Sequence, residues 1–344
     1  MKPVFHPSLV NGPFEDPALY IDFLYEKRAV LFDLGDLRLL PPRKILRVGD
    51  VFVSHTHMDH FAGFDRMLRI MLARDKVLRL YGPPGFIDRV EHRLASYTWN
   101  LVERFEADFT IIAAEFDGAA EMRSAKFRCR RRFLREHDHM AAVCDGIILD
   151  EDTFRIRAVL LDHGIACLAF ALEEKEHVNI MKNRLLEMGL GVGPWLTELK
   201  RAVLKGGEGD TPFRAWWREG GGEVRESFLP LKLLRENVLR VVPGQKIAYV
   251  TDAVCSDCNS RRIVDLARGA EYLFIEAMFL LEDQAMAREK RHLAAGQAGR
   301  LAGLAGVGRA DFFHVSPKYS EREEEVRREF EVAFIDGLRS RHDE

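Results

Sequence analysis

The chain has 344 residues, of which 47% are hydrophobic and 31% are charged, as expected of a globular protein with a large core. The formal net charge of −3 excludes a generally basic surface, so any contact with nucleic acid must come from a local patch. The five scattered cysteines do not suggest a disulfide framework, no apolar run reaches membrane-spanning length, and the start of the chain lacks a signal-peptide core, so we expect a cytoplasmic protein with no membrane contact.

Two short strands are predicted near the start of the chain, over residues 18–24 and 29–32, on either side of a charged turn. The second strand ends at Asp33, which is followed by Leu-Gly-Asp. Asp33 is a candidate for a residue that orients a metal-binding histidine. A turn or a helix cap explains this aspartate equally well.

The next strand ends in a dense set of possible metal ligands, since residues 51–60 read VFVSHTHMDH. His55 and His57 are two positions apart, so an extended loop can aim both at one ion, while Asp59 and His60 can face a second ion beside it. Imidazole and carboxylate ligands without thiolate favour Zn²⁺, Mn²⁺ or Fe²⁺ in an open, catalytic site. The alternative is a polar surface loop, but so many regularly spaced ligands rarely occur together by accident.

The following region alternates helical and strand patterns and then becomes rich in predicted strands, over residues 108–161. Residues 126–130 alternate between apolar and basic, and further arginines follow to Arg135. This basic face is either a solvated strand surface or a surface that follows RNA phosphates. A second histidine cluster, at 137–139, follows charged residues and no apolar strand, so we interpret it as a surface loop.

Residues 174–243 differ in character from their surroundings. Glycine and charge increase there, and three of the four tryptophans fall in this stretch: Trp195, Trp216 and Trp217. From 175 to 240 there are 12 Lys and Arg against 9 Asp and Glu, a local charge of +3. We expect an arm inserted within a single domain that spans residues 1–344.

Three further candidate ligands follow predicted strands. His163 comes after the apolar strand 156–161, Asp252 ends the strand that starts at residue 246, and His314 follows two phenylalanines in the segment that starts at Asp311. Strands that alternate with helices predict an α/β core. Because every candidate lies at a strand exit, one sheet edge could collect them all.

These features together resemble the metallo-β-lactamase superfamily and, more narrowly, the ribonuclease Z family of tRNA 3′-processing endonucleases. The resemblance is collinear over most of residues 29–320. Beyond the ligand positions, it depends on five segments: YGPPG at 81–85, GLGVGPW at 189–195, FIEAMF at 274–279, HLAAGQA at 292–298 and HVSPKY at 314–319.

The resemblance implies an αββα four-layer sandwich with two divalent ions between its sheets, zinc first and manganese or iron as alternatives. His55, His57 and His163 would hold one ion, Asp59, His60 and His314 the other, and Asp252 would bridge the two. Two such ions can share a hydroxide that attacks a phosphodiester, with Asp59 orienting it. His292 is then the candidate general acid, or else a residue that caps the helix predicted to start there and to run to Ala305.

The implied function is removal of the 3′ trailer from precursor tRNA by a homodimer whose arm grips the tRNA. The chain also departs from the family. It lacks an N-terminal Pro-x-x-Arg-Asn segment, Met58 replaces a common glycine, and Leu293 and Ala294 replace hydroxyl residues. These departures leave open a metallo-phosphodiesterase that acts on small or cyclic phosphodiesters. A non-catalytic RNA-binding protein is a third alternative, disfavoured because all seven ligand positions are filled. No second cysteine pair accompanies Cys255 and Cys258, so we interpret their segment as a structural loop rather than a redox or zinc site.

Overall fold

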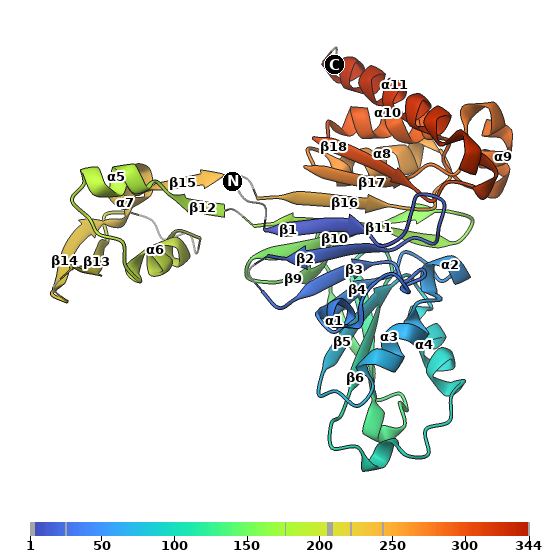
Figure 1. The fold of residues 1–344 in the computed structure, drawn as a ribbon, viewed down its shortest axis with the longest axis horizontal. Coiled ribbons are helices and arrows are strands. Elements are labelled where there is room, and N and C mark those ends of the chain that lie inside the picture. The colour runs from blue at the N-terminus through green and yellow to red at the C-terminus, as the bar shows by residue number, and fades with distance from the viewer. Residues whose placement is uncertain are drawn as a thin grey trace. The chain divides into compact units, whose positions relative to one another are not determined.

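The computed structural model describes residues 4–24, 26–175, 177–204, 209–220, 222–242 and 244–342. Among these residues, the largest sheet has eight strands in sequence order (Figure 1). Strands β3, β4, β5 and β6 run parallel to one another, and the remaining neighbouring pairs of this sheet are antiparallel. The strands are β1 (Phe5–Leu9), β2 (Leu19–Phe23), β3 (Ala29–Phe32), β4 (Val48–Phe52), β5 (Val77–Gly82), β6 (Thr110–Phe116), β7 (Glu121–Arg128) and β8 (His139–Ala142).

A second sheet of six described strands has the order β18-β17-β16-β11-β10-β9. Strands β16, β17 and β18 are parallel to one another, so their carboxyl ends lie at the same sheet edge. The strands are β9 (Ile147–Asp150), β10 (Phe154–Asp162), β11 (Ala166–Glu174), β16 (Lys246–Val250), β17 (Tyr272–Glu276) and β18 (Arg309–Phe313).

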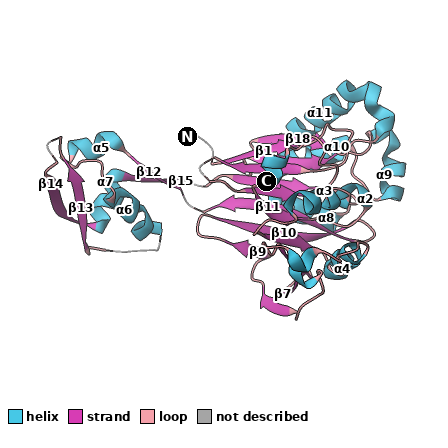
Figure 2. Cartoon of the chain, turned by 60° about the horizontal axis from the view of Figure 1, so that its bottom comes forward, coloured by secondary structure: helices cyan, strands magenta, loops and turns pink. Residues whose placement is uncertain are grey.

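Helices lie on the outer face of each sheet (Figures 1 and 2). No described helix is long and apolar enough to cross a membrane. Beside the first sheet are α1 (Pro42–Ile45), α2 (Met58–Phe61), α3 (Phe64–Met71) and α4 (Phe86–Ala95); beside the second are α8 (Asp257–Ala267), α9 (Gln284–Lys290), α10 (Ala295–Ala305) and α11 (Glu323–His342); 3₁₀ turns occur at Val102–Arg104, Cys129–Arg131, Leu281–Asp283 and Pro317–Arg322.

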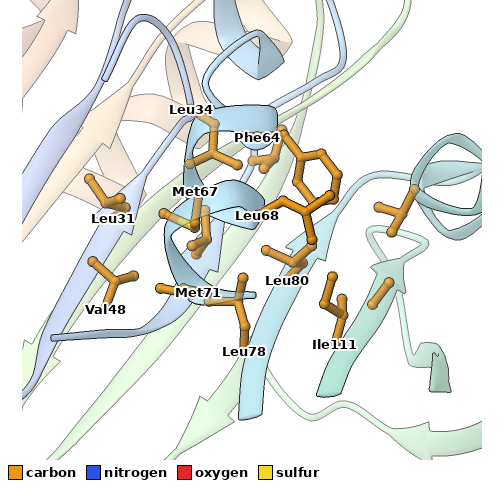
Figure 3. Close-up of a cluster of buried hydrophobic side chains, with 14 of the residues drawn as sticks. Leu31, Leu34, Val48, Phe64, Met67, Leu68, Met71, Leu78, Leu80 and Ile111 are labelled. Atoms are coloured by element: carbon orange, nitrogen blue, oxygen red, sulfur yellow. The ribbon is translucent and has the colours of Figure 1, made fainter. Parts of the chain in front are cut away.

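Three hydrophobic clusters separate the four layers. One packs strand residues such as Leu31 and Leu80 against Phe64 of α3 (Figure 3). A second, rich in aromatic rings, fills the space between the two sheets and includes Phe32 and Phe170, whose ring centroids are 5.4 Å apart. The third packs the outer face of the second sheet against α8, α10 and α11. The layers therefore follow the predicted order of helices, sheet, sheet and helices.

Residues 174–244 form a separate compact unit. Its two ends meet in the second sheet, since Glu173 of β11 pairs with Lys246 of β16. The unit has its own core around Trp195 and Trp217. The described elements are β12 (His177–Ile180), α5 (Lys182–Glu187), α6 (Trp195–Leu204), β13 (Pro212–Arg218), β14 (Val224–Pro230), α7 (Leu231–Val238) and β15 (Leu239–Val242).

Two details differ from the sequence-based expectations. The edge strand β1 was not predicted, because His6, Pro7 and Ser8 interrupt its apolar pattern. The helix predicted to open at His292 begins at Ala295 and is preceded by Ala294 at the N-cap position. His292 therefore lies outside the helix, and the capping alternative for its role was wrong.

A charged cluster ties the two sheets together and gives a stability prediction. The fully buried carboxylate of Asp50 accepts hydrogen bonds from Arg28 at 2.7 Å and Arg79 at 2.5 Å, and both arginines also reach Glu151 before β10. We expect Asp50→Asn to lower the free energy of unfolding by about 3–5 kcal/mol, because two partly buried guanidinium groups lose a charged partner. Urea denaturation followed by circular dichroism measures this.

The matched control is Glu325→Gln, which removes an exposed pair with Arg322 and should leave the free energy of unfolding almost unchanged, because solvent screens such a pair. Equal losses for the two variants would show that the buried cluster has no special structural role.

Candidate metal centre

All seven candidate ligands of the sequence analysis come together at one end of the sandwich. His55 and His57 lie in the loop after β4, and Asp59 and His60 lie on the short helix α2 that follows at once. The other three come from the second sheet, at the exits of β10, β16 and β18. Their nitrogen and oxygen atoms fall into two candidate groups, within each of which the atoms lie no more than 4.8 Å apart: His55, His57, His163 and Asp252 (the first group), and Asp59, His60 and His314 (the second group). A third such group joins Asp252 and His314 to Glu276 and His292.

Asp252 faces both groups. Its Oδ2 lies 3.5 Å from His55 Nε2 and 3.3 Å from His163 Nε2. Its Oδ1 lies 3.5 Å from His60 Nε2 and 3.0 Å from His314 Nδ1. Burial alone would raise the pKa of Asp252, but the adjacent His314 and His60 hold the pKa well below its ordinary value. A permanent carboxylate with one oxygen toward each group has the geometry of a bridging ligand.

Asp33 organises the histidines from behind. Its buried carboxylate accepts hydrogen bonds from Ser54 N at 2.6 Å, Ser54 Oγ at 2.8 Å, Tyr249 OH at 2.8 Å and His60 Nδ1 at 2.9 Å. Ser54 Oγ in turn lies 3.1 Å from His55 Nδ1 and can accept its proton. Of the alternatives left open for Asp33, the structure favours the orienting role, because these contacts direct Nε2 of both histidines into the site.

The atoms that face the centre are suited to metal binding. Among the described residues, Nε2 of His55, Nε2 of His60 and Nδ1 of His314 are buried and have no hydrogen-bond partner. Burial, together with the neighbouring histidines, lowers the pKa of His55 to about 2, so this imidazole is neutral and keeps its lone pair. Orphaned imidazole nitrogens beside carboxylates, with no thiolate, fit divalent cations such as zinc.

His163 and the exposed His57 complete the first group. His163 Nδ1 donates to the carbonyl of Arg291 at 2.8 Å, which leaves Nε2 toward Asp252. The centroid of the His57 ring lies 4.4 Å from the ring centroid of His55 and 5.3 Å from that of His163. The first group is thus open to solvent at His57.

Glu276 is a site residue that the sequence analysis did not assign. This fully buried carboxylate accepts hydrogen bonds from Ala253 N at 2.7 Å, Leu293 N at 3.2 Å and His292 Nδ1 at 2.9 Å. Burial lowers the pKa of His292, but the attraction of Glu276 outweighs it and the net pKa is raised. The sequence did contain a clue to this residue, because Glu276 stands at the end of a predicted strand, as Asp252 does.

The other sequence candidates lie outside these groups. Arg128 pairs with Glu136 at 2.5 Å and Arg135 with Asp88 at 2.8 Å, which favours a solvated, paired surface for that basic strand. The histidine cluster at 137–139 and the exposed Cys255 and Cys258 belong to none of the metal-binding groups found among the described residues.

The layer order and the paired ligand groups at one end of the sandwich define a metallo-β-lactamase fold. The solved structures agree: the metallo-beta-lactamase fold protein YhfI from Bacillus subtilis has a TM-score of 0.53 at 14% identity, covering 95% of this chain and 92% of that one. Unliganded yeast PDE1 has a TM-score of 0.52 at 9% identity, covering 98% and 94%. These likenesses establish the fold alone.

Sequence relatives narrow the class. No family model matches the chain. It is 31% identical over 319 residues to ribonuclease Z of Deinococcus radiodurans, covering 91% of each protein. It is 27% identical over 303 residues to ribonuclease Z of Methanothermobacter thermautotrophicus, covering 85% of this chain and 79% of the relative. The chain belongs to the ribonuclease Z family, as its motifs predicted.

Proposed function

We propose that this protein is a metal-dependent endoribonuclease that removes the 3′ trailer of precursor tRNA and leaves a 3′-hydroxyl. The observation that carries the proposal is the pair of ligand groups joined by Asp252, in a chain that belongs to the ribonuclease Z family. We further propose that the protein is cytoplasmic and forms a homodimer. Light scattering on the purified protein would test the dimer.

The donor set fits two divalent ions, with zinc as the first choice. His55, His57 and His163 would hold one ion, Asp59, His60 and His314 the other, with Asp252 between both. When bound, such ions lower the pKa of the attacking water and neutralise charge on the phosphodiester.

Asp59 is the residue proposed to direct the attacking water. Its Oδ2 lies 3.1 Å from His314 Nε2 and 3.4 Å from His60 Nε2, and the side chain is 42% exposed. Burial alone would raise the pKa of Asp59, but the adjacent His314 and His60 lower it, so the group is ionised and can accept a proton from water.

His292 is the proposed general acid. Its Nδ1 proton is committed to Glu276, so Nε2 is the atom that would give a proton to the leaving oxygen. Glu276 favours the charged imidazolium, which holds that proton until the bond breaks. The His292 and His163 rings are 4.8 Å apart, so the acid lies beside the first group.

We expect His292→Ala to lower kcat for RNA cleavage by about 10²–10⁴-fold, the usual contribution of general acid catalysis, while two metal ions per chain remain bound. Hydrolysis of bis(p-nitrophenyl) phosphate should fall much less, because p-nitrophenolate leaves without protonation. Metal analysis and both rates test this. Loss of metal from the variant would make His292 a ligand, in keeping with its closeness to Asp252 and His314, and would remove the acid assignment.

A phosphodiesterase that acts on small or cyclic phosphodiesters is the second candidate. The departures at Leu293 and Ala294, directly after His292, favour it. Comparing kcat/KM for a 3′-extended precursor tRNA and for bis(p-nitrophenyl) phosphate separates the two. A strong preference for the tRNA supports the ribonuclease, whereas equal or lower efficiency on the tRNA would contradict it.

A further inference from the structure

The first turn of α8 contacts the segments that follow β10 and β16, which carry His163 and Asp252 of the first ligand group. Asn259, the third residue of this helix, is only 1% exposed. Its Oδ1 accepts a hydrogen bond from Asp162 N at 3.0 Å, and its Nδ2 donates to Asp162 O and to Val254 O, both at 2.9 Å. One side chain therefore satisfies three backbone groups that lie in two separate exits.

These two exits carry ligands. Asp162 directly precedes His163, and Val254 follows Asp252 by two residues. The strands concerned, β10 and β16, are not neighbours, because β11 lies between them. Apart from a direct bond between Val254 N and Asp162 O at 3.0 Å, the Asn259 amide supplies the link between the exits. The distance between His163 and Asp252 thus depends on Asn259, which is 97 positions from Asp162 in the sequence.

Only an amide matches this arrangement. The Val254 carbonyl requires a donor and the Asp162 N–H requires an acceptor, and asparagine offers both in one plane. Aspartate has the same size but presents acceptors alone, so it would leave the Val254 carbonyl without its donor and would set a carboxylate oxygen against the Asp162 carbonyl, which keeps its bond from Val254 N. The second ligand group has a different support, since Asp33 holds His60.

We propose that Asn259 is a positioning residue that fixes His163 and Asp252 for the metal of the first group. The inference rests on the proposed metal centre but not on the proposed RNA substrate. It predicts an unequal defect. When the Asn259 amide is lost, the first group loses the support of both His163 and Asp252, whereas the second group loses that of Asp252 alone and keeps the bond between Asp33 and His60.

The test is zinc titration of the full-length apoprotein against a competing chelator, for wild type, Asn259→Asp and the milder Asn259→Ser. We expect one of the two binding steps to weaken by about 10–100-fold in Asn259→Asp, as is typical when support behind a ligand is lost, and the other to weaken by a smaller factor, because Asp252 faces both groups. In the cobalt-loaded variant the visible absorption of the two Co²⁺ ions should change unequally.

Ser256→Ala is the matched control. Ser256 Oγ caps the same helix by accepting from Asn259 N at 3.2 Å, so its loss weakens the helix N-terminus and leaves the Asn259 side-chain amide intact. We expect both zinc affinities of this variant to match wild type. Equal weakening of both steps in Asn259→Asp, weakening of the same size in Ser256→Ala, or no weakening in Asn259→Asp would overturn the positioning role. Wild-type protein that binds no zinc would instead overturn the metal centre itself.

Discussion

Asp252→Ala is expected to abolish RNA cleavage and the uptake of a metal pair together. Among the described candidate ligands, Asp252 is the one whose two oxygens face different groups. Ions at such a site contribute several kcal/mol to charge stabilisation in the transition state, so we expect kcat/KM to fall by at least ~10³-fold. Metal analysis of the purified variant and single-turnover cleavage measure the two effects.

Thermal unfolding provides the control for this variant. Zinc that binds only the folded protein raises Tm, so adding zinc should stabilise wild type and leave Asp252→Ala unchanged. The metal-free variant should be folded, because Asp252 contributes no strand hydrogen bond. A variant that retains two ions and near-normal cleavage would contradict the bridging role.

Removal of the inserted unit is expected to produce the second large effect. Because Glu173 and Lys246 are paired neighbours, residues 174–244 can be replaced by a short turn without altering the sheet. If the unit binds tRNA away from the cut, its loss removes binding energy that positions the scissile bond. We expect kcat/KM for precursor tRNA to fall about 100-fold, equivalent to ~3 kcal/mol, while bis(p-nitrophenyl) phosphate is hydrolysed as before.

The salt dependence of cleavage refines this test. A plot of log affinity against log salt concentration becomes shallower by about one unit of slope for each phosphate contact that is lost. The deletion should therefore make cleavage of the tRNA less sensitive to salt. If both activities and the salt response were unaffected, the unit would have no substrate role.

Local patterns predicted the α/β core and the assembly of the candidate ligands, whereas the four-layer order was implied by the family resemblance. His163, Asp252 and His314 each end an apolar run, and strand exits at one edge must lie near one another. The same logic was available for Glu276, whose neighbour Ile275 pairs with Val250 just before the exit that carries Asp252. It was not applied because a single acid after a strand has several ordinary explanations.

The supporting contacts could not be predicted in this way. Asn259 and Asp162 are far apart in sequence, and nothing in either segment specifies the partner. Asp33 was recognised as a candidate, but its bond to Tyr249 spans 216 positions and only the packing of two sheets brings it about. The start of α10 was misjudged because His292, Leu293 and Ala294 read as helical while Glu276 holds the first two outside the helix.

Cleavage of a 5′-end-labelled, 3′-extended precursor tRNA by the zinc-loaded protein tests the central claim most directly. We expect a single cut near the discriminator base that leaves a 3′-hydroxyl, and no cut from Asp252→Ala. Metal-replete protein that leaves this RNA intact yet hydrolyses bis(p-nitrophenyl) phosphate would contradict the tRNA-processing function and leave the metal centre standing.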